Sequence, residues 1–255
     1  MTEISTKWDR DKYLNKDYVS LFGVNIFEYD MKLGGFNIAR EYKLLPEKRL
    51  KELESYSKNK IHTLIGIHCK DKNYLEKQQE GFKNARKAFF ESNGIEDYEL
   101  LSVKKDALFV LKRCDTPSEF KYIEFVEKNF YTSYIYTGTL ELYYFNHDID
   151  VKGIGDDMLP VHADGMLKFI DKIFNFMEFS NKKTAFKYIR KFVDDYKSYN
   201  LPVEYYREFS STSVFKDKYG NIFDMFGEDE KEELDISYNF IKVILPLLKI
   251  VMCSR

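Results

Sequence analysis

The spacing of apolar residues changes along the chain near residue 155. Before that point, short runs rich in aromatic and β-branched residues are separated by helical segments. Beyond Pro160 the apolar residues recur at the spacing of amphipathic helices. This pattern predicts an α+β fold, with an α+β core over residues 1–155 followed by a helical region over residues 156–255.

Composition limits the function classes. The 255 residues include 40 Lys+Arg and 42 Asp+Glu, so a protein that coats nucleic acid by net charge alone is excluded, while a local basic cleft is not. The three cysteines form no CxxC pair, which favours a reducing compartment. Since we find no signal-like N-terminus and no apolar run long enough to span a bilayer, we expect a cytoplasmic protein with no membrane partner.

Local patterns predict the individual elements. We expect helices at 44–57, 73–93, 166–179, 184–199 and 235–252, the second ended by Gly94 and the last kinked by Pro246. We expect strands at 24–30, 122–126, 131–136, 140–145 and 150–155, and a β-hairpin over 98–112 that turns at 104–106. Residues 61–68 form a short apolar stretch that we interpret as extended, with His62 and His68 facing the same side.

Two acidic residues are the first candidates for chemistry. Asp30 ends the first predicted strand, and Asp106 stands in the predicted hairpin turn. Carboxylates at the ends of adjacent strands can hold Mg²⁺, which prefers oxygen ligands and leaves room for phosphate oxygens. Taken alone, the same residues are also typical of a turn cap and a solvated hairpin.

The order of strand with Asp, helix and hairpin with Asp resembles the palm domain of right-handed nucleic-acid polymerases, most closely that of family B DNA polymerases. The similar segments are Tyr29-Asp30-Met31-Lys32-Leu33-Gly34-Gly35, Lys104-Lys105-Asp106-Ala107-Leu108-Phe109-Val110, part of Lys87 to Gly94, and Asp150 to Ile154. The chain departs from the family at Lys104, where the family has an acid, and at Gly35, where it has a Tyr that excludes ribonucleotides.

The resemblance implies a palm-like antiparallel sheet with packed helices and a thumb-like helical region. It implies template-directed nucleotidyl transfer, by a minimal polymerase or the catalytic subunit of a split enzyme, with Asp30 and Asp106 binding two Mg²⁺ ions. Lys83, Lys87 and Gly35 would then contact the nucleoside triphosphate, and Lys105 and Lys152 the nucleic acid. A second protein subunit is the expected partner, and a phage origin, hence the host cytoplasm, is compatible with the composition.

Other readings stay open. Each of these lysines is also typical of a solvated surface, and the sequence His147-Asp148-Ile149-Asp150 is typical of a turn as well as of an acidic metal site. The aromatic residues 130, 131, 134, 136 and 143–145 could stack on bases or pack the sheet.

The last predicted helix is more apolar than one buried face requires, so we expect it to be buried or to dock on another protein. The alternative function is therefore a non-catalytic phage accessory or inhibitor protein that binds a protein or nucleic-acid partner. An accessible cleft with Asp30 facing Asp106 would favour the enzyme, and carboxylates on opposite faces would favour the alternative.

Overall fold

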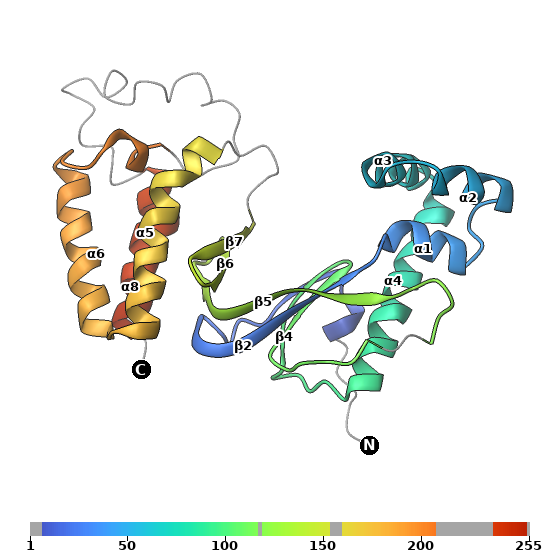
Figure 1. Ribbon diagram of the computed structural model, residues 1–255, viewed down its shortest axis with the longest axis horizontal. Coiled ribbons are helices and arrows are strands. Elements are labelled where there is room, and N and C mark those ends of the chain that lie inside the picture. Colours follow the sequence, from blue (N-terminus) through green and yellow to red (C-terminus); the bar gives the residue numbers. More distant parts are fainter. Residues whose placement is uncertain (1–6, 117–118, 154–159, 208–236, 254–255) are drawn as a thin grey trace. The chain divides into compact units, whose positions relative to one another are not determined.

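The computed structural model describes residues 7–116, 119–153, 160–207 and 237–253, and it confirms the predicted α+β class (Figure 1). Two compact units are formed, one from Met1–Lys16 and Asn25–Phe130 and the other from Asp17–Val24 and Tyr131–Arg255. This grouping differs from the predicted boundary after residue 155. The later strands belong with the helices because their apolar side chains share one core with them.

Seven strands form one sheet in the order β1-β3-β4-β2-β5-β6-β7. The pairs β1–β3, β3–β4, β2–β4, β5–β6 and β6–β7 are antiparallel. The strands are β1 (Lys12–Leu14), β2 (Ser20–Met31), β3 (Leu100–Lys104), β4 (Ala107–Val110), β5 (Phe125–Tyr136), β6 (Glu141–Phe145) and β7 (Asp148–Lys152).

The strand at 24–30 and the hairpin at 98–112 are confirmed, as β2 and as β3 with β4. The separate strands expected at 122–126 and 131–136 are instead one strand, β5. Its polar middle interrupts the apolar pattern, but Lys128 and Asn129 bond the buried Glu28 of β2 and the backbone stays extended. Part of the strand expected at 150–155 lies outside the described residues.

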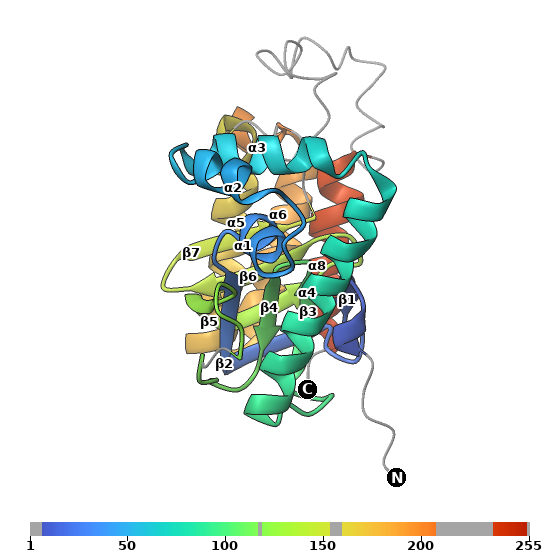
Figure 2. The same cartoon turned by 90° about the vertical axis from the view of Figure 1, so that its right-hand side faces the viewer.

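In the first unit, η1 (Lys7–Asp9), α1 (Gly34–Glu41), α2 (Glu47–Glu54), α3 (Lys58–His68) and α4 (Lys72–Asn93) accompany the strands. Helix α4 is the helix predicted at 73–93; Asp71 caps its first turn, and Gly94 ends it with φ +54°. Phe82, Ala85 and Phe89 of α4 pack with strand residues in one core, on the sheet face that α4 covers (Figure 2).

The stretch at 61–68 is helical, as part of α3, and the extended interpretation was wrong. Ile61 and Ile65 are buried four residues apart, which is a helical spacing that the surrounding apolar residues obscured. Gly34 and Gly35 begin α1.

The helices predicted in the second unit are confirmed where they are described, as α5 (Pro160–Phe179), α6 (Lys182–Lys197) and the π-helix η6 (Phe240–Ile244) with α8 (Leu245–Cys253). The short 3-10 helix η2 (Val203–Tyr205) was not predicted. The core of this unit combines Ile135, Leu142 and Tyr144 of the strands with apolar residues of all these helices. Pro246 has no N–H to continue an α-helical ladder, and the turn before it is π-helical, with the Leu245 N–H bonded to the Phe240 carbonyl.

Candidate functional site

The structure places the two predicted catalytic acids at the same end of neighbouring strands. Asp30 of β2 pairs with Ala107 of β4, and the Met31 N–H donates to the Asp106 carbonyl oxygen at 2.9 Å. Strands β2 and β3 flank β4 and are joined through α1 to α4, which is a split β-α-β arrangement. The order expected from the polymerase resemblance is therefore present in the first unit.

Asp30 lies on the sheet face that carries Glu28, because alternate residues of a strand share a face. Lys128 Nζ is 3.5 Å from Asp30 Oδ2 and 3.3 Å from Glu28 Oε1. Burial lowers the pKa of Lys128, but the carboxylates of Glu28 and Asp30 outweigh it and the net pKa is raised. Asp30 is thus already part of an ion-pair cluster.

Asp106 lies on the other face, beneath α1 and α4. A Cβ added to Gly34 of α1 would stand 3.4 Å from the Asp106 Cβ. The same added atom would also contact the Met31 and Phe82 side chains, so Asp106 lies next to these two residues. Met31 and Phe82 belong to the core under α4, so the Asp106 side chain leaves the sheet toward α4 and Asp30 away from it. Burial, with the Asp30 charge second, raises the pKa of Asp106.

Two-metal catalysis requires both carboxylates to converge on the same ions at about 2.0–2.1 Å. In this arrangement they diverge from the two faces of one sheet. Within the described ranges, no group of three or more His, Cys, Asp or Glu side chains is arranged to hold a metal ion. The geometry thus gives no support to the magnesium site, which stays a prediction.

Arg86 of α4 is the buried cation near the hairpin turn. Its side chain is fully buried, Nη1 donates to the Lys105 carbonyl oxygen at 2.6 Å, and Nη2 lies 3.1 Å from Asp11 Oδ1. Burial lowers the pKa of Arg86, opposed by the charges of Asp11, Asp9 and Asp106. The arginine therefore ties α4 to the turn and to the N-terminal segment, which is a structural role.

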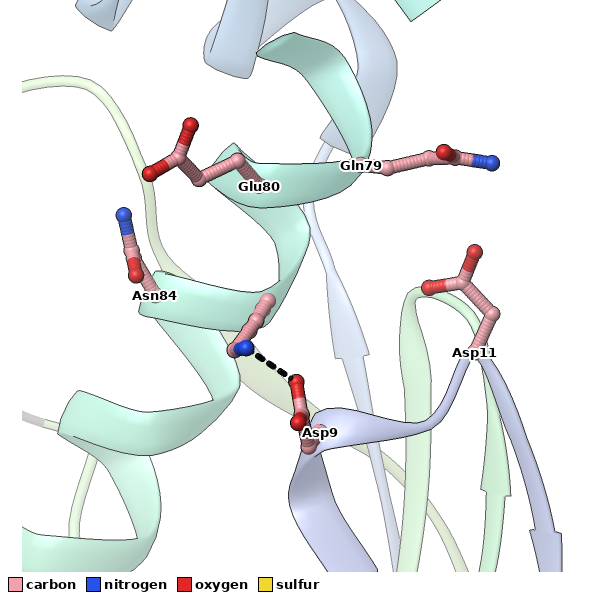
Figure 3. A pocket seen from close by; sticks show the side chains of 6 residues that line it. Asp9, Asp11, Gln79, Glu80 and Asn84 are labelled. Carbon is pink, nitrogen blue, oxygen red and sulfur yellow. Dashed lines mark ion pairs between the residues drawn. The ribbon is translucent and has the colours of Figure 1, made fainter. Parts of the chain in front are cut away.

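Lys83, predicted to hold a triphosphate, pairs with Asp9 at 2.6 Å at the edge of a pocket of about 420 Å³. The pocket is lined by Asp9, Asp11, Gln79, Glu80, Lys83 and Asn84. Figure 3 shows the aspartates on the N-terminal segment and Gln79 and Glu80 on α4. A triphosphate would meet the carboxylates of Asp9, Asp11 and Glu80 here, and the charge of Lys83 is already balanced by Asp9.

The other predicted nucleotide contacts are apart from this pocket. Lys87 lies 3.8 Å from Glu91, one turn further along α4. A Cβ on Gly35 would stand 3.2 Å from the Ile65 side chain and 3.4 Å from Gln78 Nε2, so Gly35 permits close helix packing. The structure does not bring Gly35 together with the two lysines around one pocket.

The predicted nucleic-acid contacts have local partners. Lys105 adopts φ +56° in the hairpin turn, and its Nζ lies 4.9 Å from the centroid of the Phe82 ring. Lys152 Nζ is 2.7 Å from Asp150 Oδ2 in the second unit. Contact of either lysine with nucleic acid stays a prediction.

The remaining sequence candidates are largely structural. His147 Nδ1 bonds Asp171 at 2.8 Å, and Asp150 accepts from the Tyr131 hydroxyl at 2.7 Å. Of the aromatic residues proposed to stack on bases, four are buried, and only Phe145 is exposed. The buried four are Tyr131, Tyr134, Tyr143 and Tyr144.

A second pocket, of about 540 Å³, lies beside the last helix in the second unit. It is lined by Val19, Ser20, Tyr136, Thr137, Gly138, Pro246, Lys249, Ile250 and Cys253. The Tyr136 N–H donates to the carbonyl oxygen of Val19, the residue before β2, at 2.8 Å, which joins the two strand segments that line the pocket. Lys249 is its one charged lining residue in the described chain.

The last helix, η6 with α8, has two apolar sides. One side is buried in the core of the second unit through Val243, Ile244, Leu247, Ile250 and Val251. The other carries Ile241, Leu245 and Met252, which are 40%, 48% and 56% exposed, together with the half-buried Leu248. We name Ile241, Leu245, Leu248 and Met252 the exposed stripe. Their spacing of four, three and four residues places them along one side of the helix.

Residues 1–253 match the family described as Bacteriophage PBS1 gene 130 protein. The chain belongs to this family. The description names a phage and a gene, which supports the expected phage origin. Comparison with curated proteins gives no match.

In this PBS1 gene 130 family member, sequence reasoning missed the pocket beside the last helix. Its three lining segments are far apart in sequence, so no local pattern joins them. The surplus of apolar residues on the helix was the available signal, and the expected burial is confirmed for one of its sides. None of the described helices has the length and hydropathy of a membrane span.

Proposed function

We propose that this phage protein works by binding another protein through the exposed side of its last helix. One observation carries the proposal. The exposed stripe and an apolar pocket lie next to each other on the same helix, and the opposite side of that helix is buried in the core. Apolar side chains gathered on one exposed surface are typical of interaction sites. This is the non-catalytic alternative considered from the sequence.

Rigid support favours binding at this surface. The helix contacts α6 and contributes five buried residues to the core, so the exposed side chains project from a fixed backbone. Preorganised apolar groups lose less conformational entropy on binding than groups on a loop. The pocket beside them gives a concave site for one large partner side chain.

Site-specific photocrosslinking during infection tests the proposal. A photoreactive amino acid replaces Leu245 or Met252 in the full chain, and Phe179 in a matched control. Phe179 is also apolar and is 75% exposed, but it ends α5. We expect positions 245 and 252 to give the same protein adduct, identified by mass spectrometry, and position 179 not to give it. Equal adducts at all three positions, or none at 245 and 252, would refute the proposal.

Nucleotidyl transfer is the second candidate, because the split β-α-β order brings Asp30 and Asp106 to the same end of neighbouring strands. The opposed side-chain directions count against it. A primer-extension assay with Mg²⁺ and both nucleotide sets tests this candidate directly, and template-dependent extension that is lost in Asp106→Asn would establish it over the binding proposal.

A further inference from the structure

We propose that the partner segment is an acidic amphipathic helix, an inference that rests on the proposed function and specifies its ligand. The first reason is charge. Residues 237–253 contain two lysines, Lys242 and Lys249, and no Asp or Glu, whereas the whole chain carries a net charge of −2. Both lysines are exposed. The described part of the last helix is therefore cationic on a protein whose overall charge is slightly negative.

The position of Lys249 relates this charge to the apolar surface. On a helix with about 100° per residue, Lys249 projects between Leu245 of the exposed stripe and Pro246 and Ile250 of the pocket. No acid of the described chain forms an ion pair with Lys249 or Lys242. A carboxylate of the partner would therefore meet a lysine for which no acid of the described residues competes, next to the apolar contact.

Shape favours a helix as the occupant. The exposed stripe runs from Ile241 to Met252, about 16 Å or three helical turns. A partner helix with apolar residues at the same spacing matches this length, and one of its large side chains can enter the pocket of about 540 Å³. Because Lys242 and Lys249 are seven residues apart and lie on the same side of the helix, acidic residues along one side of the partner's apolar face would then lie near both lysines.

The observations favour this occupant over two others. A second copy of the chain would bring Lys242 and Lys249 toward the same two cations, and like charges across an interface oppose association. A membrane surface is flat and would leave the concave pocket unfilled, and two lysines give only weak attraction to anionic lipid. Both occupants are outcomes of the test.

Fluorescence anisotropy with three labelled 18-residue peptides tests the inference on the full chain. All share one apolar helical face of Leu and Phe, and the flanking positions are Glu, Gln or Lys. The two exposed ion pairs that the Glu peptide would make correspond to about two- to thirty-fold in affinity. We therefore expect the Glu peptide to bind tighter than the Gln peptide by that factor, and the Lys peptide to bind most weakly. The preference should decrease at 0.5 M salt.

Charge-swap variants locate the effect. In Lys242→Glu/Lys249→Glu we expect the order of the peptides to reverse. The control Lys187→Glu/Lys191→Glu changes two exposed lysines of α6 and should keep the original order. The inference would be overturned by equal affinities for the three peptides or by no binding of any peptide. It would also be overturned by a concentration-dependent dimer in light scattering, or by binding to vesicles containing phosphatidylserine as tight as binding to the Glu peptide. If the photocrosslink at position 245 persists in that case, the binding function stands and only the acidic ligand is refuted.

Discussion

Two identical substitutions on the last helix separate its buried side from its exposed side. Leu247 is fully buried in the core of the second unit, whereas Leu245, two residues earlier, is 48% exposed. Leu247→Ala removes buried methyl groups and leaves a cavity, for which the cost is about 2–5 kcal/mol in free energy of unfolding. Leu245→Ala removes a partly solvated side chain, and we expect a change within about 0.5 kcal/mol.

Urea denaturation followed by far-UV circular dichroism measures the difference. With a slope of about 3 kcal/mol per molar urea, Leu247→Ala should lower the midpoint of the transition by about 0.7–1.7 M, and Leu245→Ala should leave it nearly unchanged. Leu247→Asp, which buries a charge, should prevent stable folding of the second unit. Equal shifts for the two alanine variants would show that the helix does not have one core side and one exposed side.

Four further substitutions test the first unit and the exposed stripe. Asp106→Asn should leave the fold intact. Because burial raises the pKa of Asp106 in the folded state, the wild type should lose stability relative to this variant as pH rises above about 4. Equal pH profiles of the two proteins in urea titrations would contradict the placement of Asp106. Arg86→Met removes the partner of Asp11 and of the Lys105 carbonyl and should destabilise the chain by about 3–5 kcal/mol. The control Lys87→Met, on the same helix with an exposed partner, should cost less than about 1 kcal/mol. Similar thermal unfolding of both variants would refute a structural role of Arg86. Met252→Glu should abolish the photocrosslink from position 245 without changing the circular dichroism spectrum, and an undiminished adduct would exclude Met252 from the contact.

Local patterns predicted the elements that depend on neighbouring residues. The hairpin at Lys105 and Asp106, helix α4 with its Gly94 terminus and the helices of the second unit follow from turn chemistry and periodicity. The continuity of β5 did not, because its polar middle is held by side chains of another strand, 100 residues earlier in the case of Lys128 and Glu28.

The candidate sites show the same limit. That Asp30 and Asp106 lie on adjacent strands follows from the order of elements, but their divergence depends on the strand register and on the left-handed backbone at Lys105. The pocket beside the last helix joins Val19, Tyr136 and Ile250, which are distant in sequence. Register and long-range packing set both features, and neither leaves a local pattern in the sequence.

The affinity of the crosslinked partner for the full chain tests the central claim most directly. Purified partner is titrated by calorimetry against the wild type, Leu245→Glu and the matched surface variant Phe179→Glu. If the exposed stripe is the binding surface, Leu245→Glu should weaken the dissociation constant at least about ten-fold, as for a residue near the centre of an interface, and Phe179→Glu should leave it unchanged. Equal dissociation constants for the three proteins would contradict the account.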